Sequence, residues 1–577
     1  MESKVGDNDE FIESIVCKVQ DFKSGHDEEM KEVTLGGDGK CLLVRHRNGE
    51  FTAMGHKCTH YGAPLIKGVL SNNRVRCPWH GACFNTQTGD IEDFPGLDSL
   101  HLFLVTVQDD DVIVRAKKRH LIKNKRNDLL EKSCMTSANV EPEDHNVVII
   151  GGGPSSLTCA ETLRKEGFTG RVILVSKERH PPYDRPKLSK ALDVSPSSAY
   201  LRPGQDYYEK IGIELRNDVE VLEVDVVAKS VKMSKSIPGT ASKQLKYDDL
   251  VIATGGEPRT LEPIPGWNLK NVFVLRTPDD ANAIAEASKD KKVVIVGSSF
   301  IGMEVASFLG AKKIPASIAV VCGKKSAVPF QSSLGKLVGH VIQQIHEEKA
   351  GVKFHPLVGV AGLFSGDDGD TGYVREVELS DGTRIEAEVV VVGIGVIPAT
   401  SFLRGSEIRM NERGFIPVDG RMQTKIPHVY AVGDITLFPF SWRDGELVNV
   451  QHWQMAHTHG RIAAMDIAES LRRTKRPYHA AISTNHSGRP IKSVPFFWTV
   501  QFGSSIRYTG YGAGFNDVII SGSLDERKFA AYYFKNDVVV AVATIMADPL
   551  AAQIAEKILS GVVITRNDIP VRLPEEN

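Results

Sequence analysis

Residues 147–176 read VVIIGGGPSSLTCAETLRKEGFTGRVILVS. The segment passes from a short apolar strand through a glycine-rich turn and an amphipathic helix to a second apolar strand, the pattern of a βαβ unit. Gly151 permits the tight turn, and Gly153 lets a pyrophosphate approach the backbone at the start of the helix, where amide dipoles stabilise its charge. Ser156 replaces the third glycine that such a turn usually has. This stretch therefore predicts a dinucleotide-binding, Rossmann-like domain.

A second unit of the same kind lies in VVIVGSSFIGMEVASFLG, residues 293–310. It keeps Gly297 and Gly302 but has Ser299 at the middle glycine, where the pyrophosphate of a nicotinamide nucleotide would approach. The side chain at this position favours weaker nucleotide binding than a glycine would. The sequence thus predicts a second Rossmann-like domain.

The residues after the second strand of each unit bear on ribose recognition. Glu178 is placed to accept hydrogen bonds from ribose hydroxyls, as the acidic residue of the fingerprint should. In the second unit the strand ends in Cys322, where an NADH-selective site would offer a carboxylate, and Lys324 and Lys325 follow. Because the carboxylate is absent and two lysines follow, the site could bind the 2′-phosphate of NADPH, so both NADH and NADPH remain candidate cofactors.

The segments on either side have other patterns. A chain of 577 residues is expected to form about three or four domains. Residues 13–116 alternate short apolar stretches with Gly, Asn and Asp turns, which predicts a small all-β domain. Residues 117–145 are polar and unpatterned, so we interpret them as a linker with a solvated basic run. Residues 494–577 predict strands followed by a helix, a closing α+β domain.

Composition excludes several classes of function. With 70 basic and 72 acidic side chains, the chain has no overall field that would hold nucleic acid. No apolar run reaches the ~18 residues needed to span a bilayer, and the opening MESKVGDNDE is too acidic for a signal peptide. The eight cysteines form no disulfide scaffold, so we expect a reducing compartment, most simply the cytoplasm.

Two short loops carry metal-ligating residues. Cys58-Thr-His60 and Cys77-Pro-Trp-His80 each offer one thiolate and one imidazole, and 16 residues separate the two pairs. Two thiolates suit one iron of a 2Fe-2S cluster and two neutral imidazoles suit the other. Tetrahedral zinc accepts the same four ligands, but zinc fingers usually pair Cys with Cys and His with His. The mixed loops therefore favour the cluster.

The loops CTHYGAPL and CPWHGACFNTQTGD closely resemble the Rieske signature. High-potential Rieske proteins brace these loops with a disulfide, and the matching positions here are Ala63 and Trp79. The resemblance therefore implies a ferredoxin-like cluster of lower potential. Cys83 receives no role and is expected to be a buried thiol.

Three further motifs identify the flavoprotein half: YDRPKLSK (183–190), DDLVIATGG (248–256) and YAVGD (430–434). With these, the chain resembles the ferredoxin reductase and apoptosis-inducing factor family over nearly its whole length, especially the branch with an N-terminal Rieske domain.

This resemblance implies an FAD-binding domain over residues 146–268 and 397–480, with an NAD(P)-binding domain over 269–396 between its two parts. The expected fold is thus a multidomain α/β chain with an N-terminal all-β Rieske domain and a C-terminal α+β domain.

The resemblance also implies roles for residues around the flavin. Arg185 is expected to contact the FAD phosphates, and Thr254 and Gly255 to pack where the chain returns from the flavin domain. Asp434 is expected to hold the ribityl and pyrophosphate region. Aromatic side chains are expected to line the flavin: His452, Trp453 and Trp498. A cationic Lys190 beside the flavin N5, paired with Glu304, is expected to stabilise negative charge on the reduced flavin.

The flavoprotein half has no Cys-x-x-Cys pair, so dithiol chemistry is excluded there. FAD takes two electrons as a hydride and a 2Fe-2S centre carries one, so the sequence predicts an NAD(P)H reductase serving an unidentified one-electron acceptor. A redox-regulated signalling or cell-death protein with little turnover is the alternative. A Rieske oxygenase would need a domain with a 2-His-1-carboxylate iron site, which no remaining segment provides. The oligomeric state stays open.

The predicted linker allows two arrangements of the cluster domain. As a flexible coil its 29 residues would span about 30 Å, enough for the cluster domain to move as a swinging carrier. The alternative is a linker packed on the flavoprotein, with the cluster docked in one place.

Overall fold

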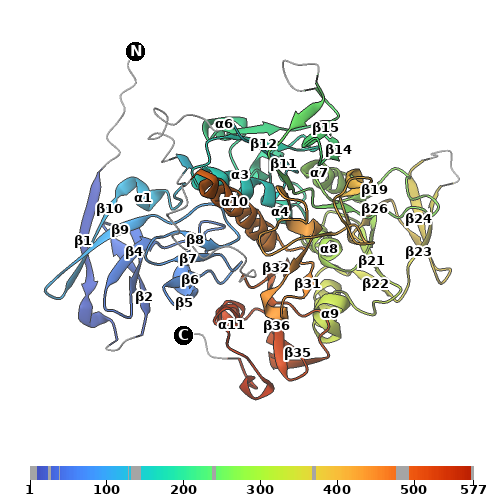
Figure 1. Ribbon diagram of the computed structural model, residues 1–577. Helices are drawn as coiled ribbons and strands as arrows, with labels where there is room; N and C mark the ends of the chain where they lie inside the picture. Colours follow the sequence, from blue (N-terminus) through green and yellow to red (C-terminus); the bar gives the residue numbers. More distant parts are fainter. Residues whose placement is uncertain are drawn as a thin grey trace, which may run out of the picture.

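The computed structural model describes residues 10–23, 27–37, 39–127, 129–130, 144–236, 242–366, 372–475 and 493–573. An all-β domain (blue) comes first, two α/β domains (cyan to yellow, with α10 in orange) follow, and a C-terminal α+β domain (orange to red) closes the chain (Figure 1). This is the expected fold class. No helix among these residues is long and apolar enough to cross a membrane.

The all-β domain contains two antiparallel sheets. The first has the order β1 (Phe11–Lys18), β10 (Asp111–Lys117), β9 (Leu102–Gln108), β4 (Phe51–Gly55), β3 (Gly39–Arg45) and β2 (Glu29–Leu35). The second has the order β5 (Val69–Ser71), β6 (Arg74–Arg76), β7 (Cys83–Asn85) and β8 (Ile91–Asp93). One cluster loop ends just before β5 and the other joins β6 to β7, so the second sheet positions both pairs of candidate ligands.

The first α/β domain is built on a five-stranded parallel sheet. Its order is β13 (Ile213–Arg216), β12 (Arg171–Val175), β11 (Asn146–Ile150), β17 (Asp249–Ile252) and β29 (Val429–Ala431). Helices α3 (Pro154–Lys165) and α10 (Trp453–Lys475) lie side by side next to the sheet (Figure 1). Gly460 allows this approach, because a Cβ there would lie 2.1 Å from the carbonyl oxygen of Ser155. Two distant parts of the chain thus build one domain.

The second α/β domain has a similar parallel sheet, in the order β19 (Val272–Val274), β26 (Val389–Val392), β20 (Lys292–Val296), β21 (Ser317–Gly323) and β22 (Lys353–Pro356). Helices α7 (Pro278–Ala287), α8 (Phe300–Ala311) and α9 (Gln331–Ala350) belong to it. The sequence of α8, FIGMEVASFLGA, is apolar on nearly every side, and such a helix is stable only when buried. It packs against the sheet on one side and against the C-terminal domain on the other.

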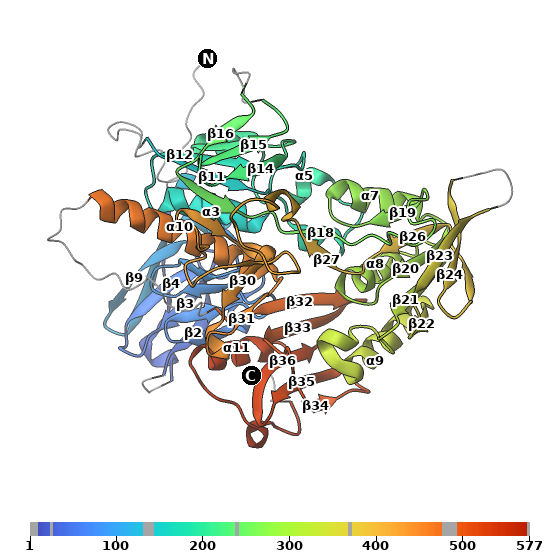
Figure 2. The same ribbon diagram turned by 45° about the vertical axis from the view of Figure 1, so that its right-hand side comes forward.

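The C-terminal domain is an antiparallel sheet with one helix. The sheet order is β32 (Phe496–Gln501), β33 (Ser504–Gly510), β36 (Val538–Ile545), β35 (Lys528–Lys535) and β34 (Asp517–Ser523), and α11 (Leu550–Leu559) follows. This domain lies between the all-β domain and the second α/β domain (Figure 2). Strand β32 contacts α8, α9 and α10, so it joins all the parts that meet at the candidate site.

The first part of the predicted linker is structured, which corrects that expectation. Helix α1 (Lys118–Ile122) packs on the all-β domain, Arg126 forms a β-bridge with Ser99, and Leu129 is buried in the core of the first α/β domain. Arg126 is held by backbone hydrogen bonds, and the leucines Leu121 and Leu129 pack singly against the two domains. Such isolated contacts leave no apolar period in the sequence. Residues 131–143 of the predicted linker lie outside the described part of the chain.

Candidate functional site

A cavity of about 730 Å³ opens where both α/β domains meet the C-terminal domain. The glycine turn at 151–153 forms one wall of the cavity. Gly151 has a φ of +125°, and a Cβ there would lie 2.2 Å from the carbonyl oxygen of Ala253. A Cβ on Gly153 would meet nothing within 4 Å, so the backbone at the start of α3 is open to a bound group. The turn has the geometry expected of a pyrophosphate site.

Most of the residues expected around the flavin line this one cavity: Gly151, Gly153, Glu178, Arg185, Lys190, Thr254, Gly255, Glu304, Asp434, His452, Trp453 and Trp498. Ser156 does not line it, because it is fully buried inside α3. The first glycine turn and the motifs that follow it thus converge on one site.

The residues expected to bind the nicotinamide nucleotide are arranged differently. Gly297 and Gly302 lie beside the cavity rather than in its wall, and a Cβ on Gly302 would lie 2.1 Å from the carbonyl oxygen of Gly297. Both glycines therefore serve close packing at the start of α8, while Ser299 reaches the cavity wall. Lys324 and Lys325 are exposed beyond β21 and do not line the cavity. Their contact with a nucleotide stays a prediction.

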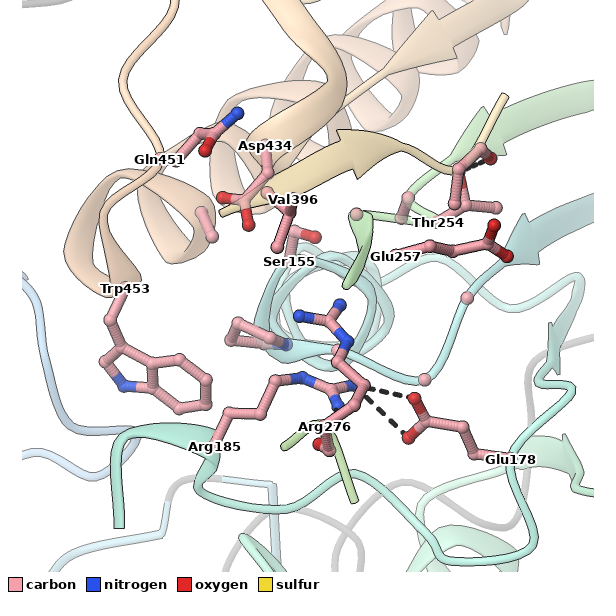
Figure 3. Close-up of a pocket in the computed structure, with 18 of the residues that line it drawn as sticks. Ser155, Glu178, Arg185, Thr254, Glu257, Arg276, Val396, Asp434, Gln451 and Trp453 are labelled. Carbon is pink, nitrogen blue, oxygen red and sulfur yellow. Dashed lines mark hydrogen bonds and ion pairs between the residues drawn. The ribbon is translucent and has the colours of Figure 1, made fainter. Parts of the chain in front are cut away.

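Two half-buried arginines line the same cavity as the glycine turn. Arg185 donates two hydrogen bonds to the carboxylate of Glu178, at 3.1 and 3.2 Å, and Arg276 lies beside it (Figure 3). Burial alone would raise the pKa of Glu178, but Arg185 and Arg276 lower that pKa overall. Arg276 was missed in the sequence because it belongs to no glycine motif and stands alone in a loop before α7. Two cations at a helix start suit a pyrophosphate.

Asp434 is a half-buried carboxylate that points into the cavity (Figure 3). Burial raises its pKa, and Arg276 and Arg185 oppose that rise. A carboxylate in this position can accept hydrogen bonds from the hydroxyl groups of a bound sugar chain.

Lys190 and Glu304 form the ion pair expected from the sequence. The Lys190 Nζ atom lies 2.8 Å from the Glu304 Oε1 atom, and only 5% of the Glu304 side chain is exposed. The carboxylate also accepts hydrogen bonds from Ser189 and from the Thr499 hydroxyl, the latter at 2.7 Å. Glu304 is therefore held in place by side chains of two different parts of the chain, the first α/β domain and strand β32.

The hydrogen bonds continue beyond Thr499. Gln501 donates to the Thr499 hydroxyl at 2.9 Å, and its carbonyl oxygen lies 2.8 Å from the Nε2 atom of the buried His346 on α9. The polar side chains on β32 alternate with apolar ones. In the sequence, this alternation predicts that the polar side chains lie on a solvent-exposed face of the strand. Only the position of α8 and α9 shows that this face is buried.

Aromatic side chains form the wall toward the all-β domain. His452, Trp453, Phe497 and Trp498 all line the cavity. Burial lowers the pKa of His452 to about 4, so its imidazole is neutral near pH 7. The Trp498 ring also reaches out of the cavity, with its centroid 4.3 Å from that of His80. This residue touches both candidate redox sites.

The four predicted metal ligands form two pairs. The Nδ1 atoms of His60 and His80 lie 3.1 Å apart, close enough to bind one ion, and the thiols of Cys58 and Cys77 are hydrogen-bond partners. Burial lowers the pKa of His60 to about 3, which keeps that imidazole neutral as a ligand must be. Within the described ranges, no three His, Cys, Asp or Glu side chains converge to hold one ion. One pair of thiols and one pair of imidazoles match the two irons of a 2Fe-2S cluster.

Cys83 begins strand β7, directly after the loop that carries Cys77 and His80, but it belongs to neither ligand pair. Its thiol is fully buried, and burial raises its pKa to about 12. It is the buried thiol expected from the sequence.

The all-β domain is docked on the flavoprotein half by a buried network that we call the latch, defined by Arg76, Asp93, Gln454 and Glu556. The fully buried Arg76 donates from Nε to Glu556 on α11, at 2.5 Å, and its Nη1 atom lies 3.2 Å from Asp93. Asp93 in turn accepts from Gln454 on α10 at 2.8 Å. The structure thus has the docked arrangement of the cluster domain, the alternative to a swinging carrier.

Together the fold and the site define a flavoprotein reductase of the ferredoxin reductase type, fused to a Rieske domain. Residues 145–460 match the pyridine nucleotide-disulphide oxidoreductase family, residues 13–107 the Rieske [2Fe-2S] domain, and residues 496–568 the reductase C-terminal domain. The chain belongs to the pyridine nucleotide-disulphide oxidoreductase family. Human apoptosis-inducing factor 3 is 45% identical to it over 97% of this chain and 86% of its own length.

Several reductases are also similar to this chain. Rhodocoxin reductase of Rhodococcus erythropolis is 30% identical over 67% of this chain and 83% of its own length. Among solved structures, a ferredoxin reductase of Rhodopseudomonas palustris has a TM-score of 0.63 and 28% identity, covering 73% of this chain and 96% of that one. The covalent complex of putidaredoxin reductase with putidaredoxin has a TM-score of 0.64 and 27% identity, covering 74% and 95%.

The residues fit the cofactors that these families imply. The open glycine turn with Arg185 and Arg276 suits the FAD pyrophosphate, and Asp434 suits its sugar hydroxyls. The paired Cys58 and Cys77 with the paired histidines suit a 2Fe-2S cluster.

Proposed function

We propose that this chain is an NAD(P)H-dependent reductase that moves electrons through FAD to its own Rieske cluster and on to a one-electron acceptor outside the chain. When bound, FAD takes up two electrons with a hydride and the cluster carries them away one at a time. The position of Trp498 is the observation that carries the proposal. Its side chain is part of the cavity wall and lies 4.3 Å from His80, so one residue bridges the two cofactor sites.

A relative supports the same direction of transfer. Putidaredoxin reductase has been trapped in a covalent complex with putidaredoxin, a separate protein. In this chain the iron–sulfur domain is covalently joined and docked beside the cavity. A fused, docked carrier needs no diffusional encounter, so the effective concentration of the first electron acceptor is high.

Lys190 has a defined part in this proposal. Glu304 holds the ammonium group at the cavity wall, where a positive charge favours negative charge on the group bound there. Because Ser189 and Thr499 also donate to Glu304, the carboxylate is fixed before any ligand arrives.

Anaerobic titration of the enzyme with NADH and with NADPH tests the proposal. We expect either nucleotide to bleach the flavin absorbance and to produce the paramagnetic signal of the reduced cluster, and the more effective nucleotide identifies the preferred cofactor. Flavin reduction without any cluster signal would show that electrons do not follow the Trp498 route.

Replacing Glu304 by alanine is expected to slow reduction of bound flavin by nucleotide at least tenfold, which corresponds to about 1.4 kcal/mol of activation free energy. The reason is that Lys190 loses the partner that holds it at the cavity wall. FAD content should stay near that of the wild type, because Glu304 is not among the groups that suit the pyrophosphate. Stopped-flow absorbance and the flavin-to-protein ratio measure the two effects.

The matched control is Glu286→Ala, which removes the exposed partner of Lys289 on α7. An exposed pair of this kind contributes ~0–1 kcal/mol to stability, so the control should leave both measurements unchanged. Equal loss of reduction rate and of FAD in the Glu304 variant would mean that the pair is purely structural.

A further inference from the structure

This inference rests on the proposed function and concerns the place where electrons leave the cluster. The docked arrangement covers the side of the ligands that faces the flavoprotein: His80 is only 8% exposed and Trp498 lies against it. If the latch keeps the domain docked, an external acceptor has to approach from the other side.

Two aromatic residues next to the ligands are partly exposed. Tyr61 follows the ligand His60 in the chain, stacks on its ring at 4.1 Å with an interplanar angle of 18°, and is 47% exposed. Trp79 precedes the ligand His80, lies 6.3 Å from its ring, and is 37% exposed. Each imidazole therefore has one aromatic neighbour that extends to the surface.

Tyr61 is also fixed in place by the flavoprotein half. Its hydroxyl donates a hydrogen bond to Asp184, which lies just before the short helix α4 (Arg185–Leu188). The contact crosses the domain boundary at the edge of the exposed surface. The position of Tyr61 is thus a property of the docked enzyme.

Exposed lysines lie near the cluster loops. Lys125 is exposed and acts electrostatically on the His60 imidazole. The loop that carries His60 begins at Lys57 and ends at Lys67, and both of these lysines are exposed.

The carboxylates nearby are already engaged. Asp184 accepts from Tyr61, and Asp98, whose backbone carbonyl accepts from Thr59, pairs with Arg202 at 2.8 Å. Since the acids are paired and the exposed lysines project from the cluster loop, the surface around the cluster favours a negatively charged partner.

We infer that Tyr61 and Trp79, with the rim lysines Lys57 and Lys67, form the surface through which electrons leave, and that this exit face binds an acidic electron-carrier protein. Aromatic side chains surrounded by a charged rim are typical of protein–protein interfaces. Opposite charges on the two partners raise the association rate, and that gain decreases with salt. The stacked ring of Tyr61 brings the partner's redox centre close to His60 without undocking the cluster domain.

The test uses the loaded full-length enzyme, reduced by its nucleotide, with two protein acceptors of opposite charge: cytochrome b5, which is acidic, and cytochrome c, which is basic. We expect the wild type to reduce cytochrome b5 with a kcat/KM that decreases as salt increases. The double variant Lys57→Glu with Lys67→Glu should lower that kcat/KM at least fivefold at low salt and abolish the salt dependence. Trp79→Ala should lower it as well, but without changing the salt dependence.

The control Lys232→Glu makes the same charge change at an exposed position on the small sheet of the first α/β domain, and should leave kcat/KM unchanged. Stopped-flow reduction of the flavin and the cluster signal are followed in every variant. Two results would overturn the exit face alone, provided that the cluster is reduced normally. One is a kcat/KM for cytochrome b5 that the lysine changes do not affect, and the other is a kcat/KM for cytochrome b5 that is lower than that for cytochrome c. A wild-type cluster that nucleotide does not reduce would instead overturn the proposed function.

Discussion

Replacing Glu556 by alanine is expected to slow electron transfer from flavin to cluster at least tenfold, while reduction of the flavin by nucleotide proceeds as in the wild type. Removing one partner of a buried ion pair costs about 3–5 kcal/mol, because the other charge stays buried without compensation. Here the charge left behind is that of Arg76, which is fully buried, loses its 2.5 Å contact and keeps only the longer contact with Asp93 at 3.2 Å, so part of this cost applies. Undocking relieves that cost by returning Arg76 to water, and it separates His80 from Trp498.

Glu556 is the sharper choice than Arg76 for this experiment, because it lies on α11 of the C-terminal domain and leaves the cluster domain's own sequence intact. Stopped-flow spectroscopy separates the two electron-transfer steps, and small-angle scattering reports the expanded, undocked shape. The control Glu166→Ala removes the partner of Arg472 in an exposed pair and should change neither.

A second variant tests whether the slower transfer comes from the buried charge rather than from the loss of the glutamate side chain. Combining Arg76→Met with Glu556→Leu removes both charges of this pair, and apolar replacements of a buried ion pair often preserve stability. Asp93 keeps its hydrogen bond from Gln454. We expect the double variant to recover most of the transfer rate that Glu556→Ala loses. Wild-type rates in Glu556→Ala would mean that the latch does not hold the domain.

Replacing His80 by cysteine is expected to lower the reduction potential of the cluster by on the order of 100 mV or more. A charged thiolate replaces a neutral imidazole, and all-thiolate 2Fe-2S clusters lie near −400 mV, against about −150 to +300 mV for Rieske centres. The lower potential makes transfer from flavin less favourable, so the cluster should stay largely oxidised during turnover. A redox titration followed by the paramagnetic signal measures the shift.

Cys83→Ser is the matched control for this ligand exchange. Cys83 is buried in the same domain but lies outside both ligand pairs, so its replacement should leave the cluster content and the potential unchanged. An unchanged or higher potential in His80→Cys would contradict the assignment of His80 as a ligand.

The parts of the site that the sequence predicted correctly are local. The turn at Gly151 and Gly153 lies within one βαβ unit, and its conformation depends on a φ of +125° that glycine tolerates. The Cys and His loops are likewise short segments whose residue types decide which metal they can bind. The ion pair of Lys190 with Glu304 joins residues that are 114 positions apart by their difference in number, and it was predicted from the family resemblance rather than from spacing.

What the sequence analysis missed depends on distant segments. Arg276 and Thr499 have no motif of their own and act in the site only because the two α/β domains and β32 meet there. The first part of the predicted linker was misread, because Arg126 is held by a backbone bridge and α1 by isolated side chains such as Leu121, and neither leaves an apolar period.

By itself, then, the amino-acid sequence determined the class of each domain and the residue types at each candidate cofactor site, because glycine turns, paired Cys and His loops and strand periodicity are properties of short segments. Only the tertiary structure decided how the cluster domain sits on the flavoprotein. The Arg76 and Glu556 side chains meet across 480 positions, and Trp498 meets His80 across a domain boundary. Such contacts follow from the packing of whole domains, since no spacing along the chain encodes which buried charge another domain will neutralise.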